Sequence, residues 1–173
     1  MSGLFIIPIS GLKEGRHLYD FEIGNHFFDE FEESEIKECN LSVTVLLDRR
    51  SSHFDLIFKI CGEIRVSCDR CLEMFFQHIE CENKLLVKFG KKWDDTDPDI
   101  ITIPADEHEL DIKQYLYEFI HLALPIKRVH PEGGNERNSC NPDMLKKLNQ
   151  HIVDEVKDND PRWDELKKLI NNN

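Results

Sequence analysis

The sequence lacks the features that define several large classes of protein. No apolar run approaches the roughly 20 residues that a bilayer-spanning helix needs, so we expect no association with a membrane. The H-E-x-x-H motif, a glycine-rich phosphate loop after a strand and the G-x-S-x-G elbow are all missing. These absences argue against the commonest metalloproteases, nucleotide-binding enzymes and serine hydrolases.

Positive charge is also scarce. The chain has 22 lysine and arginine residues against 34 aspartate and glutamate residues, which gives a net charge of −12 at pH 7. Such a charge keeps a protein soluble and repels a polyphosphate from most of its surface. Extensive direct binding to nucleic acid is therefore disfavoured, although the composition leaves room for a local basic patch.

The length of 173 residues suits one ordinary domain, because two full domains would each be unusually small. We predict a single α+β domain over residues 1–140 and a helical C-terminal tail over residues 141–173. The run LFIIPI has no basic residue before it, and Lys13 and Arg16 follow it, which is the reverse of a secretory signal. We interpret it as a first strand and expect the six cysteines to be reduced thiols in a cytoplasm.

Alternation of apolar and polar residues predicts three long strands joined by short turns. The alternating segments are residues 41–47, 54–66 and 75–89. A period of two directs one set of side chains to a core and the other to solvent. Gly62 interrupts the second segment and predicts a bulge or bend. The whole pattern predicts an antiparallel, strongly curved meander within an α+β fold.

Further along the chain the apolar period changes to that of a helix. Apolar residues recur at helical spacing over residues 111–122, with Asp111 as the expected N-cap and Gln114 as its capping-box partner. This helix must cover the apolar face of the sheet. Two shorter helices are predicted in the tail, because Pro142 and Pro161 each follow a capping residue at a first helical position.

The segment SCDRCLE, residues 67–73, carries the clearest chemical signal. Its C-x-x-C spacing brings the sulfurs of Cys68 and Cys71 close enough for one tetrahedral zinc ion, which needs two further nitrogen or sulfur ligands. Downstream, His130 and Cys140 flank a glycine- and asparagine-rich loop that nothing else in the sequence would order. We predict that these four residues hold one structural zinc ion, which would tie a turn between strands to the segment after the helix.

Other interpretations of the cysteine pair remain open. The second ligand pair has nine intervening residues, against about two to five in common zinc motifs, so two unliganded thiols in a turn fit equally well. A redox couple needs its first sulfur at a helix N-terminus, whereas the residues after Cys71 continue as a strand. Cys61 and Cys81 lie within the strand patterns, and we interpret them as small core residues. A small zinc- or thiol-dependent enzyme is therefore the alternative function.

Four motifs in a fixed order carry a resemblance to a known family. A C-x-R-C-L-E turn lies between two strands, an L-A-L-P segment leads to a histidine, a cysteine follows, and D-P-R-W-x-x-L-x-x-L comes last. The residues that carry them are Cys68, Arg70, Cys71, Leu72 and Glu73; Leu122, Ala123, Leu124, Pro125 and His130; Cys140; and Asp160, Pro161, Arg162, Trp163, Leu166 and Leu169. In this order they resemble the YceD-type proteins, also called large ribosomal RNA subunit accumulation proteins, over most of the chain from residue 41 onward.

The resemblance implies a non-enzymatic bacterial factor, with relatives in plastids, that is needed for accumulation of the RNA of the large ribosomal subunit. It implies work on a large-subunit precursor, through ribosomal RNA or a ribosomal protein. The chain departs from the family in a longer, glycine-rich insertion between His130 and Cys140.

Two surfaces of opposite charge can meet such partners. A basic set, in which an indole beside two lysines can stack on a base, suits RNA and consists of Arg70, Lys91, Lys92, Trp93, Lys127 and Arg128. An acidic set suits a lysine-rich extension of a ribosomal protein and consists of Asp29, Glu30, Glu32, Glu33 and Glu35. The net charge favours the acidic set, and the family resemblance does not decide between the two.

Overall fold

The structure, a computed structural model, describes residues 5–32, 34–131 and 140–151. It divides into two compact units, Met1–Cys140 and Asn141–Asn173, and each is described by itself. In the described segments the first unit holds all the strands and the helix α1 (Lys113–Ala123), and the second holds α2 (Pro142–His151). Sheets with separate helices confirm the predicted α+β class.

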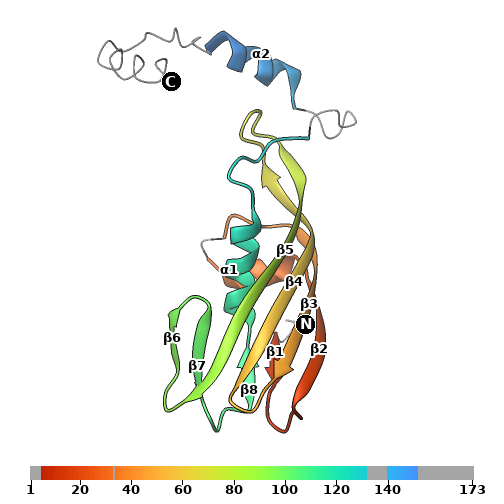
Figure 1. Ribbon diagram of the computed structural model, residues 1–173. Coiled ribbons are helices and arrows are strands. Elements are labelled where there is room, and N and C mark those ends of the chain that lie inside the picture. The colour runs from red at the N-terminus through yellow and green to blue at the C-terminus, as the bar shows by residue number, and fades with distance from the viewer. Residues whose placement is uncertain (1–4, 33, 132–139, 152–173) are drawn as a thin grey trace, which may run out of the picture. The chain divides into compact units, whose positions relative to one another are not determined.

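A six-stranded sheet forms the frame of the first unit (Figure 1). In spatial order its strands are β2 (Gly15–Ile23), β3 (Cys39–Arg49), β4 (His53–Ser67), β5 (Met74–Gly90), β7 (Ile100–Pro104) and β6 (Asp94–Asp97). Neighbouring strands run antiparallel, except that β5 and β7 pair in parallel. The predicted meander is β3-β4-β5, so its three strands and their order are confirmed.

One face of this sheet is buried and the other, called here the outer face, is exposed. On β4 the even-numbered side chains are buried: Phe54, Leu56, Phe58, Ile60, Ile64 and Val66. Because successive side chains point to opposite faces, odd-numbered Cys61 lies on the outer face and is exposed. Our interpretation of Cys61 as a core residue is therefore wrong, and Cys81 on β5 is only half-buried.

Gly62 does not form the predicted bulge. The ladders from β4 to β3 and to β5 run through Gly62 without a shift of register, opposite Leu41 and Ile79. Its φ is +150°, and a Cβ atom there would lie 2.2 Å from the carbonyl oxygen of Asn40 and 2.9 Å from Cα of Leu41. Glycine is needed at this position because the neighbouring backbone comes too close for a side chain.

A small second sheet joins the N-terminal segment to the residues before α1. β1 (Ile6–Pro8) pairs antiparallel with β8 (Glu109–Asp111), which confirms a strand in the LFIIPI run. The pairing extends to the helix, because the Ile112 N–H donates to the carbonyl oxygen of Phe5 at 2.9 Å. Ile7, Leu110 and Ile112 are fully buried there. The start of α1 is therefore fixed by the first strand.

The helix α1 is the predicted long helix, and its buried residues are Leu116, Phe119 and Ile120. The rings of Phe119 and Phe58, the latter on β4, lie 5.2 Å apart between centroids, so the helix covers the buried face of the sheet. Figure 1 shows α1 lying beside β5.

The predicted capping box of α1 is wrong. The N-cap is Ile112 rather than Asp111, and the Gln114 amide donates to Glu118 instead of reaching back. Asp111 still accepts a hydrogen bond from the Lys113 N–H at 2.8 Å. The carboxylate therefore satisfies one free N–H donor of the first turn, although Asp111 lies one residue before the N-cap and not at it.

The short 3-10 helix η1 (Asn25–Glu30) adds aromatic rings to the core. Phe27 and Phe28 are buried, and the ring of Phe31 stacks on Tyr117 of α1 at 4.0 Å between centroids. These rings fill space between η1 and α1, in agreement with the expectation that they belong to a core.

The described part of the second unit is α2, which confirms the helix predicted after Asn141. Asn141 Oδ1 accepts a hydrogen bond from the Asp143 N–H at 3.0 Å, as an N-cap does. The helix predicted after Pro161 lies outside the described residues. No helix in the described segments combines the length and the apolarity needed to cross a membrane.

Candidate metal centre

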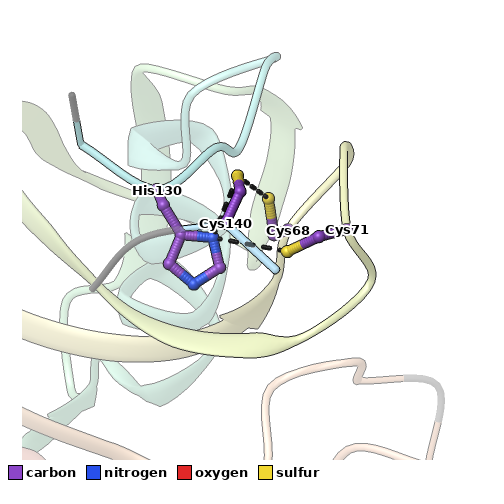
Figure 2. Close-up of side chains that lie close together, drawn as sticks. All are labelled: Cys68, Cys71, His130 and Cys140. Atoms are coloured by element: carbon purple, nitrogen blue, oxygen red, sulfur yellow. Dashed lines mark hydrogen bonds between the residues drawn. The ribbon is translucent and has the colours of Figure 1, made fainter. Parts of the chain in front are cut away.

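Cys68 and Cys71 lie in the tight turn that joins β4 to β5. The Leu72 N–H donates to the carbonyl oxygen of Cys68, and the Cys68 N–H donates to that of Glu73, both at 2.9 Å. Leu72 has a φ of +63°, a left-handed conformation that bulky residues rarely adopt, and its side chain is exposed. The turn directs both sulfur atoms to one side, as Figure 2 shows.

The segment after α1 is held against this turn by a reciprocal pair of hydrogen bonds. The Asp69 N–H donates to the carbonyl oxygen of Arg128 at 2.7 Å, and the Arg128 N–H donates to the Asp69 carboxylate at 2.6 Å. The guanidinium of Arg128 also donates to Glu35 at 2.8 Å. His130 follows, and its ring lies 4.6 Å from the ring of Phe75. Contacts that involve no metal thus bring His130 to the turn.

Four ligand atoms converge at this place (Figure 2), from the residues we name the cysteine cluster: Cys68, Cys71, His130 and Cys140. Their three Sγ atoms and one histidine ring nitrogen all lie within 4.8 Å of one another. The Sγ atoms of Cys68 and Cys140 are 3.7 Å apart, and His130 Nδ1 lies 3.6 Å from Sγ of Cys71. His130 Nδ1 lies 3.5 Å from Sγ of Cys140.

These distances match those between the ligands of one tetrahedral ion. Zinc bonds of about 2.3 Å to sulfur and about 2.0 Å to nitrogen place two sulfurs about 3.8 Å apart, and a sulfur and a nitrogen about 3.5 Å apart. The cysteine cluster therefore has the dimensions and the donor atoms of a metal site, and it can hold a metal ion.

The cysteine cluster is also largely shielded from solvent. Cys68 is 0% exposed, Cys71 2% and His130 4%, while Cys140 is half-buried. In the described segments His130 and Ser34 are the buried polar side chains. A buried imidazole needs hydrogen-bond partners or a metal ion for its ring nitrogens. The thiol sulfurs around Nδ1 are only weak hydrogen-bond partners. Burial and donor type together favour a metal over four unliganded side chains.

The thiols of the cysteine cluster differ in acidity. Burial raises the pKa of the Cys68 thiol, but hydrogen bonds from the backbone N–H groups of Cys71, Arg70 and His130 and from the His130 side chain outweigh burial and lower that pKa below its usual value. Burial and the neighbouring sulfurs of Cys68 and Cys71 raise the pKa of the Cys140 thiol. One thiolate is thus stabilised by the protein, and a bound cation would favour ionisation of the others.

The predicted basic set is divided between the two ends of β5. Near the cysteine cluster lie Arg70, Lys127 and Arg128, and beyond the other end of the strand lie Lys91, Lys92 and Trp93. The 17 residues of β5 separate the groups by about 55 Å of extended chain at about 3.3 Å per residue. The structure therefore does not bring the six residues together in one patch, and Arg128 is already paired with Glu35.

The predicted acidic set is partly engaged within the chain. Asp29 pairs with His26 at 3.1 Å, Glu30 accepts a hydrogen bond from Lys113, and Glu35 pairs with Arg128. Glu32 is exposed, and Glu33 lies outside the described residues. Internal pairing leaves less charge in this segment for a partner than the sequence suggests.

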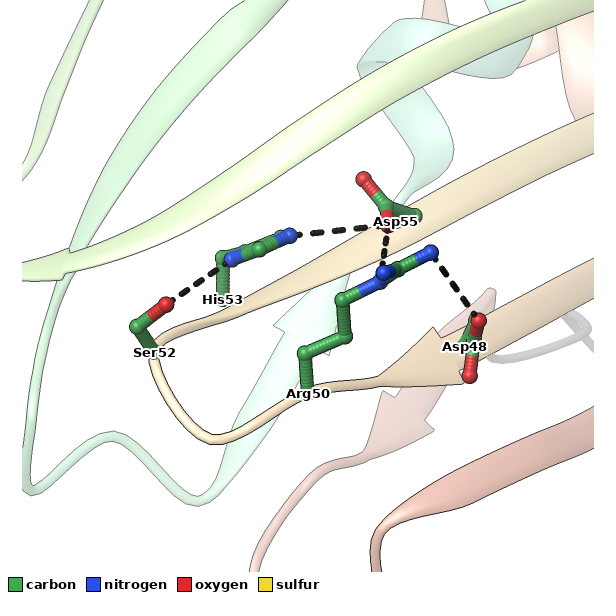
Figure 3. Close-up of polar contacts among 5 residues, drawn as sticks. All are labelled: Asp48, Arg50, Ser52, His53 and Asp55. Carbon is green, nitrogen blue, oxygen red and sulfur yellow. Dashed lines mark hydrogen bonds and ion pairs between the residues drawn. The ribbon is translucent and has the colours of Figure 1, made fainter.

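A second polar network lies at the turn between β3 and β4 (Figure 3). Ser52 Oγ is 3.0 Å from His53 Nδ1, and His53 Nε2 is 3.5 Å from Asp55 Oδ2, an order like that of a serine hydrolase. The same Asp55 oxygen, however, accepts a closer hydrogen bond from Arg50 Nε at 2.8 Å. The carboxylate is thus engaged with a guanidinium, which also approaches Asp48, and the network closes an exposed hairpin turn rather than activating the serine.

The residues that support the cysteine cluster were not predicted from the sequence. Asp69 lies inside the C-x-x-C turn, but the hydrogen bond that its carboxylate accepts comes from Arg128, 59 residues along the chain, so its role has no local signal. The roles of Phe75 and Glu35 depend on tertiary contacts and have no signal in the sequence.

The fold and the site together define an α+β protein with a C-x-x-C turn and a buried group of three cysteines and one histidine. The family described as Large ribosomal RNA subunit accumulation protein YceD matches residues 56–170, more than half of the chain. The protein belongs to the YceD family, which confirms the resemblance, and the matched region contains the whole cysteine cluster. No curated protein and no solved structure matches the chain.

Proposed function

We propose that this protein is a non-enzymatic accessory factor for assembly of the large ribosomal subunit and acts in the cytoplasm on a precursor particle. The family match over residues 56–170 carries the proposal, because the family is named for accumulation of the RNA of that subunit. The partner on the precursor is ribosomal RNA or a ribosomal protein, and the net charge of −12 favours the protein.

Within this function the cysteine cluster holds one structural zinc ion. Three sulfurs and one nitrogen form a common structural zinc ligand set, and four protein ligands leave no position for water or a substrate. A zinc- or thiol-dependent enzyme would need an open coordination position or an accessible thiolate, whereas Cys68 and Cys71 are 0% and 2% exposed. The geometry thus supports an architectural role for the ion.

The assembly role is tested by depleting the protein and resolving ribosomal particles on a sucrose gradient. We expect fewer mature large subunits and an accumulation of their precursors. Wild-type protein and the Cys61→Ser variant should restore the profile, because Cys61 lies on the outer face of β4 and outside the cysteine cluster. Normal large-subunit levels after depletion would contradict the proposal.

Affinity capture from samples with and without RNase treatment tests which partner is contacted. Large-subunit proteins that remain bound after RNase treatment would support a protein partner. Loss of every ribosomal component after RNase treatment would instead support contact through RNA.

A further inference from the structure

A cavity lies between the β6–β7 hairpin and α1, away from the cysteine cluster. Its volume is about 280 Å³, and it is lined by Trp93, Asp95, Asp97, Pro98, Asp111, Gln114, Tyr115 and Glu118. Trp93 is 45% exposed and Tyr115 is half-buried, so part of each side chain is accessible to a bound ligand. This volume is close to the lower limit of the roughly 300–1,000 Å³ of pockets for drug-sized ligands, and it leaves room for a single long side chain.

The charged residues of the cavity are all acidic. In the segments that the structure describes, no ion pair joins Asp95, Asp97, Asp111 or Glu118 to a basic side chain. Asp97 and Asp111 each accept a hydrogen bond from a backbone N–H group, which does not neutralise the charge of the carboxylate. The cavity differs in this respect from η1 and the residues after it, where neighbouring acidic groups have internal basic partners.

The negative charges converge on one aromatic residue. Burial, followed by repulsion from Asp95, Glu118 and Asp111, raises the pKa of Tyr115 to about 12. The carboxylates of Asp111, at the end of β8, and Glu118, on α1, thus act at the same place as that of Asp95 from the hairpin. A cation beside Tyr115 would be attracted by all three carboxylates.

We propose that this cavity binds the guanidinium of an arginine in a basic polypeptide segment. A guanidinium stacks on an indole or phenol ring and at the same time donates paired hydrogen bonds to carboxylates. Trp93 and Tyr115 supply the rings, while Asp95 and Glu118 supply carboxylates on opposite sides of the cavity. The inference rests on the proposed function only for the source of the segment, which would be a basic extension of a ribosomal protein.

The same surroundings disfavour RNA at Trp93. A base that stacked on this indole would bring its phosphates toward the carboxylates that line the cavity, and like charges repel. Lys91 and Lys92 precede Trp93, but neither lines the cavity. The tryptophan that the sequence placed in a basic set therefore belongs to an acidic pocket.

Titration of the full-length protein with a fluorescent peptide of alternating arginine and glycine, followed by anisotropy, tests this inference. We expect Trp93→Ala and the double change Asp95→Asn/Asp97→Asn each to weaken binding by about tenfold. A peptide with lysine in place of arginine should bind several-fold more weakly, because an ammonium cannot form the paired contacts. Circular dichroism would verify that each variant folds, and the exposed Asp95 and Asp97 can change without disturbing the core.

The matched control is the double change Glu63→Gln/Glu80→Gln, which removes the same net charge from exposed positions on the outer face. It should change affinity by less than about twofold. Equal weakening by both double variants would overturn the inference, as would unchanged binding by Trp93→Ala. Binding of single-stranded RNA that is lost in Trp93→Ala, with peptide binding intact, would also overturn it. The titration contains no ribosomes, so its failure is distinguishable from failure of the assembly role on the gradient.

Discussion

The sheet core and the cysteine cluster hold the chain together by different means. In the core, β3, β4 and β5 share continuous backbone ladders, and most of their inward side chains are buried. In the cysteine cluster, segments far apart in sequence meet through four side chains and the Asp69–Arg128 hydrogen bonds. Apolar burial stabilises the first region without a ligand, whereas the second has few contacts of its own. Stability should therefore depend on metal in one region and on packing in the other.

Removing a metal ligand should give the largest effect and confine it to one region. Purified protein is expected to contain about one equivalent of zinc. Cys68→Ser should lose most of it, because the substitution removes one of the four ligands. The effect should be large, because structural zinc supplies about 10–16 kcal/mol of apparent binding free energy in small metal-dependent domains. Elemental analysis measures the metal. Hydrogen exchange should quicken at the Cys68, Asp69 and Leu72 amides and stay slow in β4.

Cys61→Ser is the control for this experiment, because it removes an exposed thiol outside the cysteine cluster. Zinc should also be released as the pH falls, since protons compete for the thiolates and the imidazole. Protein purified without chelator that contains no zinc, with freely reactive Cys68 and Cys71, would contradict the metal site and leave the sheet core unaffected.

Gly62→Ala should produce the complementary result. The new Cβ would meet backbone atoms at 2.2 and 2.9 Å, and φ is +150°, so the two strands must separate. We expect a loss of about 2–4 kcal/mol in the free energy of unfolding, measured with a chemical denaturant. The molecules that remain folded should still bind zinc.

Gly24→Ala serves as the comparison, since a Cβ atom added at Gly24 would have no neighbouring atom within 4 Å and the backbone there is extended. Its cost should be a few tenths of a kcal/mol. Equal stability of the two variants would show that strand approach at Gly62 is not limiting.

Asp69→Ala should weaken the cysteine cluster without touching a ligand. The substitution removes the carboxylate that accepts the Arg128 N–H, so His130 loses part of its positioning. Loss of such a supporting contact lowers zinc affinity by about tenfold or more. Competition with a chromophoric chelator measures the change, and Asp69→Asn, which keeps an acceptor oxygen, should recover much of it. Unchanged affinity in the alanine variant would mean that the ligands alone position the ion.

Leu72→Gly should give the smallest effect, and it should be stabilising. Glycine adopts a φ of +63° without the steric cost that leucine incurs, and the 68% exposed side chain contributes little packing. We expect a gain of about 0.5–1 kcal/mol in thermal or chemical unfolding. Leu72→Ala keeps the left-handed strain and should show no gain, so a gain common to both variants would point to loss of exposed apolar surface instead.

The parts of the fold that could be predicted from the sequence are those with an unmistakable period. β3, β4 and β5 alternate aliphatic and polar residues, and α1 repeats apolar residues at helical spacing. β2 also alternates, but its inward positions include His17 and Tyr19 while Leu18 faces outward, so the pattern is hidden. β6 is wholly polar, and the parallel pairing of β7 with β5 follows from tertiary packing rather than local pattern.

The candidate site divides in the same way. The four members of the cysteine cluster were predicted because metal ligands come from few residue types, and the structure brings them together, although their occupation by zinc stays a prediction. The basic set was grouped by charge alone, and the length of β5 separates it. The pocket beside Trp93 was missed because Tyr115 and Glu118 lie on a helix whose approach to the hairpin no local signal encodes.

The pairing of β1 with β8 has a consequence for how the chain matures during its synthesis. Ile6 cannot form its ladder pair until Asp111, its partner, has been added to the chain. At about 5–20 residues per second, translation of the intervening segment takes on the order of 5–20 s. During that interval β1 has no strand to pair with, and the start of α1 cannot be fixed until β1 and β8 pair. The nascent protein would therefore be most vulnerable to aggregation or to capture by a chaperone before the ribosome that makes it has passed β8.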